Sequence, residues 1–137
     1  MGTLSSEKIE TIKMFIIDRL RPYLIILFGS SVTNKMRPDS DVDVAFLSEE
    51  KTGEYEIFML AQELAGMIGK EVDLVDMNKA SSVFKVQILG YGKTIHNSDD
   101  YKSSLFKIIA LKDYALLNEE RRCILDKINE RGFAYEQ

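Results

Sequence analysis

The chain has 137 residues, of which 45% are hydrophobic and 29% charged, a composition typical of one soluble globular domain with its own core. Acidic residues number 22 against 18 basic ones, and the formal net charge of -4 argues against a nucleic-acid binder that uses a broad basic face. The single cysteine excludes a disulfide framework and a multi-cysteine zinc site, and the single histidine leaves no histidine cluster for a metal.

Targeting and membrane segments are not expected. The first ten residues are polar, and the longest apolar run, residues 23–28, is far shorter than the about 20 residues that a membrane helix requires. We therefore expect a protein of the reducing cytoplasm.

Helical and strand patterns alternate along the chain and predict an α/β domain with a small mixed sheet flanked by helices. Ser5 or Ser6 is placed to cap the first helix, Pro22 to end it, and Gly69 to end a later one. In chain order the patterns predict a helix up to residue 21, a buried strand at 24–28, a short helix within 30–36, a turn at 38–40, a strand at 41–47, a helix at 54–68, a strand at 72–75, a short helix at 80–89, an edge strand at 93–96 and a helical stretch at 98–131.

The last stretch is long for one globular helix, so we expect a break near Leu117-Asn118 and an end at Gly132. Residues 1–97 form the predicted core, and residues 98–137 form a helix or helical hairpin that belongs to the same domain. The apolar side chains of this extension are numerous enough to pack on the core or to be offered to a partner, and both alternatives stay open.

Residues that suit nucleotide chemistry gather between the first two predicted strands. Gly29 lets the backbone turn sharply and approach a ligand closely, and Ser30 adds a hydroxyl donor at the mouth of the next helix, where free N–H groups favour phosphate. Asp41 and Asp43 lie two apart on a strand, so both project from one face and can hold Mg²⁺ through oxygen. A phosphate cradle beside metal carboxylates indicates a nucleoside triphosphate site for phosphoryl or nucleotidyl transfer.

The strand at 72–75 offers a third carboxylate for this site. Val72 and Leu74 require the buried face, which places Asp76 with them and Asp73 on the opposite face by period-two alternation. Because Val75 then shares the face of Asp73, the pattern favours Asp73 over Asp76 without settling the choice.

The spacing of these residues resembles a known signature. Gly29-Ser30, ten residues and then Asp41-Val42-Asp43 is similar to the motif of the nucleotidyltransferase superfamily related to DNA polymerase beta. The stretches 37–43 and 71–75 resemble its minimal (MNT) branch, in particular the antitoxins of HEPN/MNT toxin–antitoxin pairs. The resemblance covers residues 5–96 and is strongest over 24–76. Many relatives carry Arg-Ala-Arg-Gly after Gly-Ser, where this chain has residues 31–34, Ser-Val-Thr-Asn.

This resemblance implies a polymerase beta-like fold, ATP as co-substrate and two Mg²⁺ ions. It implies transfer of AMP to a tyrosine hydroxyl of a HEPN-type RNase toxin, which blocks the toxin and makes a hetero-oligomer with it the expected assembly. By match to the motif, Gly29 and Ser30 hold the triphosphate, Asp41 and Asp43 the two Mg²⁺ ions, and Asp73 the metal and the attacking hydroxyl.

Size also favours a protein partner. Polymerases, tRNA-end enzymes and antibiotic nucleotidyltransferases resemble this core but add a domain that grips their acceptor, whereas only residues 98–137 follow it here. One alternative is a nucleotidyltransferase of a small hydroxylated substrate such as an aminoglycoside. Another is a catalytically inactive antitoxin that neutralises its partner by binding alone. No direct contact with nucleic acid or membrane is expected.

Overall fold

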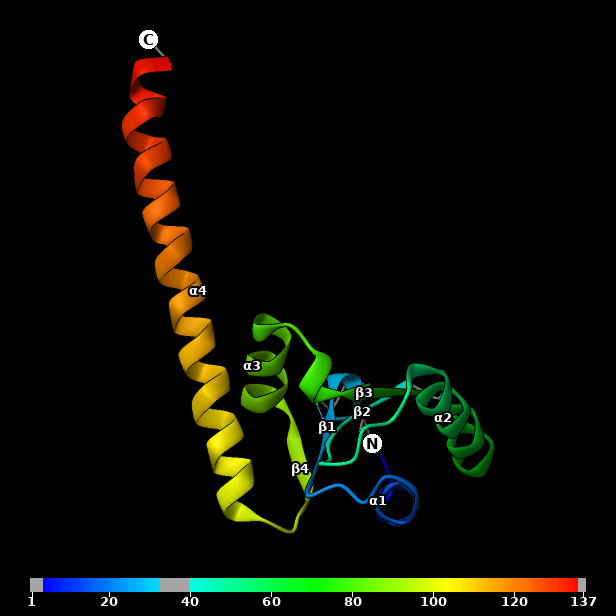
Figure 1. Cartoon of the computed structure of the whole chain (residues 1–137). Helices are drawn as coiled ribbons and strands as arrows, with labels where there is room; N and C mark the ends of the chain where they lie inside the picture. The colour runs from blue at the N-terminus through cyan, green and yellow to red at the C-terminus, as the bar shows by residue number, and fades with distance from the viewer. Residues whose placement is uncertain (1–3, 33–39, 136–137) are drawn as a thin grey trace.

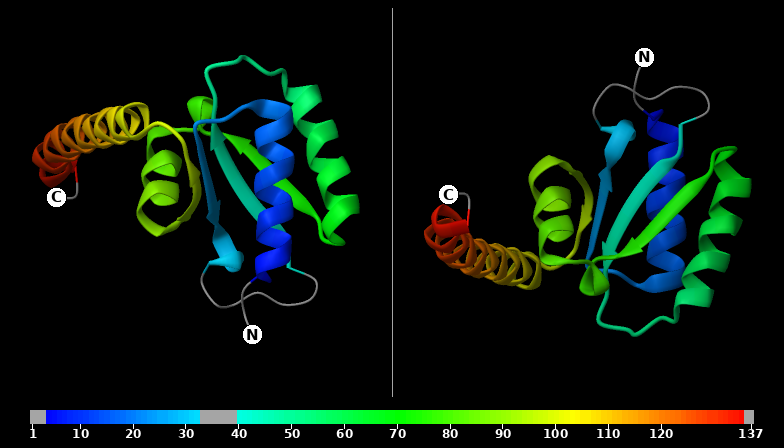
Figure 2. Two further views of the ribbon diagram at one scale, coloured as in Figure 1. Left: turned by 90° about the horizontal axis from the view of Figure 1, so that it is seen from below. Right: turned by 90° about the horizontal axis from the view of Figure 1, so that it is seen from above.

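The computed structural model describes residues 4–32 and 40–135, and in this part of the chain helices flank both faces of a small sheet (Figures 1 and 2). The elements in chain order are α1 (Ser6–Leu20), β1 (Leu24–Phe28), a 3-10 turn (Gly29–Ser31), β2 (Val42–Leu47), α2 (Glu54–Ile68), β3 (Val72–Asp76), a second 3-10 turn (Met77–Lys79), α3 (Ser82–Tyr91), β4 (Lys93–Asn97) and α4 (Asp100–Tyr135). The predicted elements are confirmed in type and order, apart from the differences given below.

The sheet has four strands in the order β3-β2-β1-β4. β1 pairs antiparallel with β2 and with β4, whereas β2 and β3 are parallel and are joined by the crossover helix α2. The sheet is therefore mixed, as the sequence predicts, and β3 and β4 are its two edges.

Each face of the sheet is covered by its own helices, as Figure 2 shows. Ile25, Leu27 and Val44 belong to a core formed with α1 and α2. Their neighbours Leu24 and Ile26 belong to a second core under α3. Because β1 is buried on both sides, its sequence is an unbroken apolar run instead of an alternating one.

The predicted ends of the first two long helices are confirmed. The Ser5 side chain accepts a hydrogen bond from the N–H of Lys8 and caps α1. Arg21, in the left-handed conformation at φ 47°, ends that helix just before Pro22. Gly69, at φ 72°, ends α2 in the same way, a conformation that glycine adopts at little cost.

The predicted break in the last helix is wrong. α4 runs without interruption for 36 residues, passing both Leu117-Asn118 and Gly132 (Figure 1). Its first turns pack on α3 and bury Ser103 and Ala110, after which it projects from the body. A break is needed only where the chain must fold back, and one glycine inside a helix costs about 1 kcal/mol, too little to end it.

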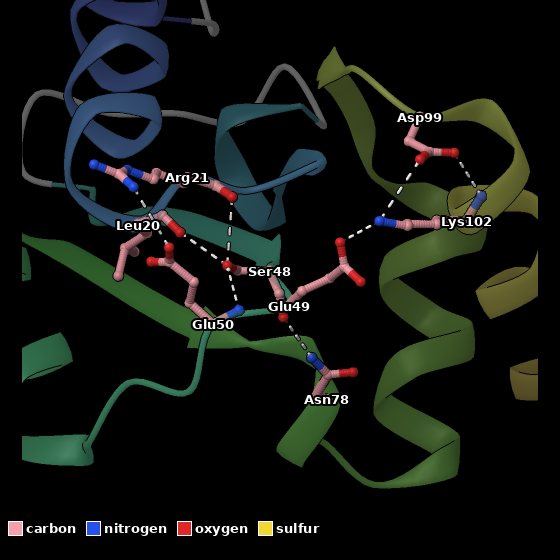
Figure 3. Close-up of polar contacts among 8 residues, drawn as sticks. All are labelled: Leu20, Arg21, Ser48, Glu49, Glu50, Asn78, Asp99 and Lys102. Atoms are coloured by element: carbon pink, nitrogen blue, oxygen red, sulfur yellow. Dashed lines mark hydrogen bonds and ion pairs between the residues drawn. The ribbon is translucent and has the colours of Figure 1, made fainter.

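A polar cluster fixes the base of α4 at the end of the sheet where β1 begins (Figure 3). Lys102 forms ion pairs with Glu49 and with Asp99, so it joins the helix to the segment after β2. The Ser103 hydroxyl donates to Asn97 Oδ1 at 2.9 Å and joins the helix to β4. These contacts set the direction in which α4 leaves the body.

Ser48, a buried polar residue directly after β2, holds the neighbouring turns together in the same cluster. Its hydroxyl donates to the carbonyl of Leu20 at 2.8 Å and accepts the N–H of Glu50 at 3.1 Å. Its own carbonyl accepts from the Asn78 amide at 3.4 Å. The side chain of Ser48 thus connects the end of α1 to the segment before α2, and its backbone carbonyl connects both to the turn after β3.

Two predictions fall wholly or partly outside the described residues: the turn at 38–40 and most of the short helix within 30–36. The described part of that helix is the 3-10 turn Gly29–Ser31. Within the described residues, no helix is long and apolar enough to cross a membrane.

Candidate active site

The backbone at the end of β1 lies directly against a carboxylate. Gly29 has φ +73°, a conformation that L side chains rarely adopt, and a Cβ atom placed on it would overlap the Asp43 carboxylate. Sheet pairing explains the closeness, because Phe28 and Asp43 are register partners on β1 and β2. Glycine is therefore required at residue 29 for two reasons: it adopts the positive φ of the turn, and it leaves room for the Asp43 carboxylate.

Ser30 connects this turn to the start of β2. Its hydroxyl donates to the carbonyl of Asp41, at a long 3.5 Å. The three-residue turn is too short to supply a helix dipole, so the described residues offer phosphate the glycine backbone and a serine hydroxyl but no helix N-terminus. Most of the helix predicted within 30–36 lies outside the described residues.

Asp41 and Asp43 occupy the beginning of β2. The strand starts at Val42, so Asp41 precedes it by one residue and is exposed, whereas Asp43 is half-buried. Asp43 lies on the α3 side of the sheet, since Val42 and Val44 on either side of it belong to the α1/α2 core.

Asp73 is the register partner of Asp43 on the parallel strand β3. Side chains of directly paired residues lie on one face of a sheet, so Asp73 also lies on the α3 side. Leu74, next to it, is buried in the α1/α2 core. The alternation predicted from the sequence is thus found in the structure, while the functional role of Asp73 remains a prediction.

Asp76, the less favoured candidate for the third carboxylate, has a structural role. Its carboxylate accepts the N–H of Asn78 at 3.0 Å and caps the 3-10 turn that follows β3. It shares the face of Leu74 by alternation, away from Asp43.

The three carboxylates interact electrostatically. The pKa of Asp43 is raised from 3.8 to about 6, first by burial, then by the charge of Asp73 and then by that of Asp41. A cation at this position would relieve the repulsion. Among residues 4–32 and 40–135, however, no three acidic, histidine or cysteine side chains are arranged as a complete metal cage.

An aromatic contact lies beside this site. The rings of Phe28 and Phe84 meet edge to face, with centroids 5.6 Å apart, and join the end of β1 to the first turn of α3. Phe28 is the residue before Gly29, so this pair supports the strand end that carries the turn. No local sequence signal marks Phe84, because its contact is with a residue far away in the chain.

Comparison with known proteins agrees with this arrangement. Residues 10–101 match the family described as polymerase beta, nucleotidyltransferase, which is more than half of the chain. The chain therefore belongs to the polymerase beta nucleotidyltransferases, and the Gly29 turn and the Asp43–Asp73 pair lie within the matched region.

Within this class the chain is a homologue of the protein adenylyltransferase MntA. It is 32% identical to MntA of Shewanella oneidensis over 128 residues, which cover 93% of this chain and 90% of that protein.

The chain is also similar to solved structures of toxin–antitoxin complexes. A toxin–antitoxin crystal structure with AMP-PNP matches at TM-score 0.79 and 30% identity, covering 88% of this chain and 97% of that one. The structure of a tri-AMPylated Shewanella oneidensis HEPN toxin in complex with its MNT antitoxin matches at TM-score 0.75 and 28% identity, covering 91% and 98%.

Proposed function

We propose that this protein is an antitoxin enzyme that transfers AMP from ATP to a tyrosine hydroxyl of a HEPN-type RNase toxin and thereby neutralises it. The observation that carries the proposal is the Asp43–Asp73 register pair beside the Gly29 turn, in a chain that aligns with MntA over 93% of its length. The relative captured with a tri-AMPylated HEPN toxin supports the acceptor, and the one with AMP-PNP supports an adenine nucleotide as donor.

Each site residue has a proposed role. Gly29 and Ser30 hold the triphosphate through the backbone and the hydroxyl, Asp41 and Asp43 hold two Mg²⁺ ions, and Asp73 shares the metal and faces the attacking hydroxyl. The donor set fits Mg²⁺, because its protein ligands are all oxygens and Mg²⁺ is usually bound by one or two carboxylates together with substrate phosphates. At such a site the substrate phosphates would supply the remaining ligands. Bound Mg²⁺ would neutralise charge on the phosphates.

The proposed transfer is a displacement at the α-phosphorus of ATP. The tyrosine oxygen forms a bond to the α-phosphorus of ATP, the bond from that phosphorus to the bridging oxygen breaks, and pyrophosphate leaves. The phenolic proton is released as the oxygen attacks, and in this proposal Asp73 accepts it. Asp43 and the Gly29 backbone hold the donor in line for this attack.

The direct test is intact-mass analysis of a HEPN toxin after incubation with this protein, ATP and Mg²⁺. The toxin should gain the mass of one or more AMP units, and tyrosine should carry them in peptide maps. A toxin of unchanged mass that is nonetheless inhibited would contradict the enzyme proposal and favour neutralisation by binding alone.

We also propose that residues 98–137 form one domain with residues 1–97. The base of α4 supports this, because Ala110 is buried against α3 and Lys102 and Ser103 bond to the core.

A further inference from the structure

The outer edge of β3 is open and hollowed. A cavity of about 500 Å³ runs along this strand, and all five β3 residues line it. One wall comes from α2 and the other from the segment that leads into α3. Because residues from both faces of β3 take part, the hollow follows the edge of the sheet and does not lie over one face.

The backbone of β3 presents hydrogen-bonding groups to this hollow. The N–H of Val42 donates to the carbonyl of Glu71 at 2.8 Å, which fixes the alternation of the parallel ladder. Asp73 and Val75 then direct their backbone groups toward β2, and Val72 and Leu74 direct theirs outward. β3 is the last strand on this side of the sheet, so the outward groups form a template for one more strand.

The walls are apolar and the rim is acidic. Ile57, Phe58 and Ala61 of α2 line one side, and Phe58 is 57% exposed although it is a large aromatic residue. The charged residues that line the hollow are Glu54, Asp73, Asp76 and Lys79. The single cation among these four is already used in part, because the Lys79 ammonium donates to the carbonyl of Thr52 at 3.3 Å.

We propose that this groove binds an extended, basic segment of the acceptor protein as an added strand on β3, and so brings the acceptor tyrosine to Asp73. This inference rests on the proposed function and names how its substrate is held. Strand addition supplies affinity through main-chain hydrogen bonds and selects sequence through the pockets for alternate side chains. Phe58 and its apolar neighbours provide such a pocket, and the acidic rim selects positive charge.

Register explains how the tyrosine would reach the site. An added strand lies about 4.8 Å from β3, as β3 does from β2. A tyrosine opposite Asp73, on the same face, then stands in line with Asp73 and Asp43 across the sheet. Its long ring extends over Asp73, so the hydroxyl meets the carboxylates while the main chain stays at the edge.

Charge favours an acceptor segment over a second copy of this chain. Edge-to-edge pairing of two β3 strands would bring the acidic edge that contains Asp73 and Asp76 close to the same acidic edge of the other copy. Like charges brought close together across a ladder repel. The same acidic residues attract a basic segment of a different protein, so they favour that segment over a second copy of this chain.

A pair of substitutions that adds positive charge tests the groove. Glu54→Lys with Phe58→Lys changes two exposed lining residues, and Glu56→Lys with Met59→Lys makes matched changes on the same helix outside the hollow. The groove variant should raise KM for the toxin roughly tenfold or more, with kcat and AMP-PNP affinity unchanged, and the control should behave as wild type. Equal KM values for both variants would overturn the groove while leaving AMP transfer itself established.

Hydrogen exchange provides a second measurement that needs no substitution. With toxin and AMP-PNP bound, the amides of Val72 and Leu74 should exchange more slowly than in the AMP-PNP complex alone. Toxin binding without any such protection would overturn strand addition. If the wild-type protein transfers no AMP to any toxin, the proposed function fails, and this inference fails with it.

Discussion

Gly29 and Asp43 occupy adjoining space: the carboxylate of Asp43 fills the position that a Cβ atom on Gly29 would take. The backbone of the turn after β1 is thereby held against the acidic pair, and any ligand bound by the turn lies beside the carboxylates. This contact joins the two halves of the sequence signature and depends on the absence of a side chain at residue 29.

Gly29→Ala should therefore disable the site. The left-handed φ alone costs about 1–2 kcal/mol for an L residue, and the overlap moves Asp43 in addition. We expect lower thermal stability and loss of AMP-PNP binding by calorimetry. Gly66→Ala is the matched control, because nothing lies within 4 Å of its added Cβ in α2, and helix propensity predicts a gain of about 0.5–1 kcal/mol. Equal effects of the two substitutions would contradict the contact.

Asp43 should make the metal-free protein less stable as pH rises. Its pKa is about 6 in the folded state against 3.8 ordinarily, so between these values the native state holds more protons than the unfolded state. The free energy of unfolding then falls as pH rises through this window and stays low above pH 6. Asp43→Asn should flatten this part of the profile and raise Tm at pH 7.5 in EDTA. If Asp43→Asn leaves the pH dependence of the free energy of unfolding unchanged, the pKa of Asp43 is not raised in the folded state.

Asp73→Asn and Asp76→Asn should separate activity from stability. Asp73→Asn removes the partner of Asp43 and should abolish AMP transfer in a single-turnover assay while the fold stays intact. Asp76→Asn weakens the cap on the Asn78 N–H, with a cost of up to about 1 kcal/mol, and should keep most activity. The reverse ranking of activities would place the third carboxylate on the other face of β3.

The projecting part of α4 should contribute little to the stability of the core. Its described large apolar side chains beyond the base, such as Leu116, Ile124 and Leu125, are 49–57% exposed. Ending the chain after Leu117 should therefore change Tm little by calorimetry, whereas Ala110→Asp, at a residue 2% exposed, should lower it strongly. A large loss on truncation would show that the outer half packs on the body.

Much of this architecture follows from local sequence signals. The apolar run 24–28 predicts a strand buried on both faces, Ser5 and Gly69 mark helix ends, and alternation places Asp73 and Asp76 on opposite faces of their strand. These predictions succeed because strand period and capping are properties of a few neighbouring residues.

The failures depend on contacts between distant residues. The predicted break near Leu117-Asn118 assumes that a long helix must fold back, but nothing local decides whether a partner surface exists. The contact of Phe28 with Phe84 and the groove along β3 arise from strand order and helix placement, which periodicity does not contain. That β3 is an edge strand is known only once the sheet is assembled.

The stoichiometry of inhibition distinguishes catalytic neutralisation of the toxin from neutralisation by binding alone. A HEPN toxin is incubated with ATP, Mg²⁺ and far less than one equivalent of this protein, the two proteins are separated, and the RNase activity of the toxin is measured. The RNase activity of the toxin should be lost and should stay lost after separation, and Asp43→Asn and Asp73→Asn should each abolish the effect. Inhibition that requires one antitoxin per toxin, ignores ATP and disappears on separation would contradict catalytic neutralisation.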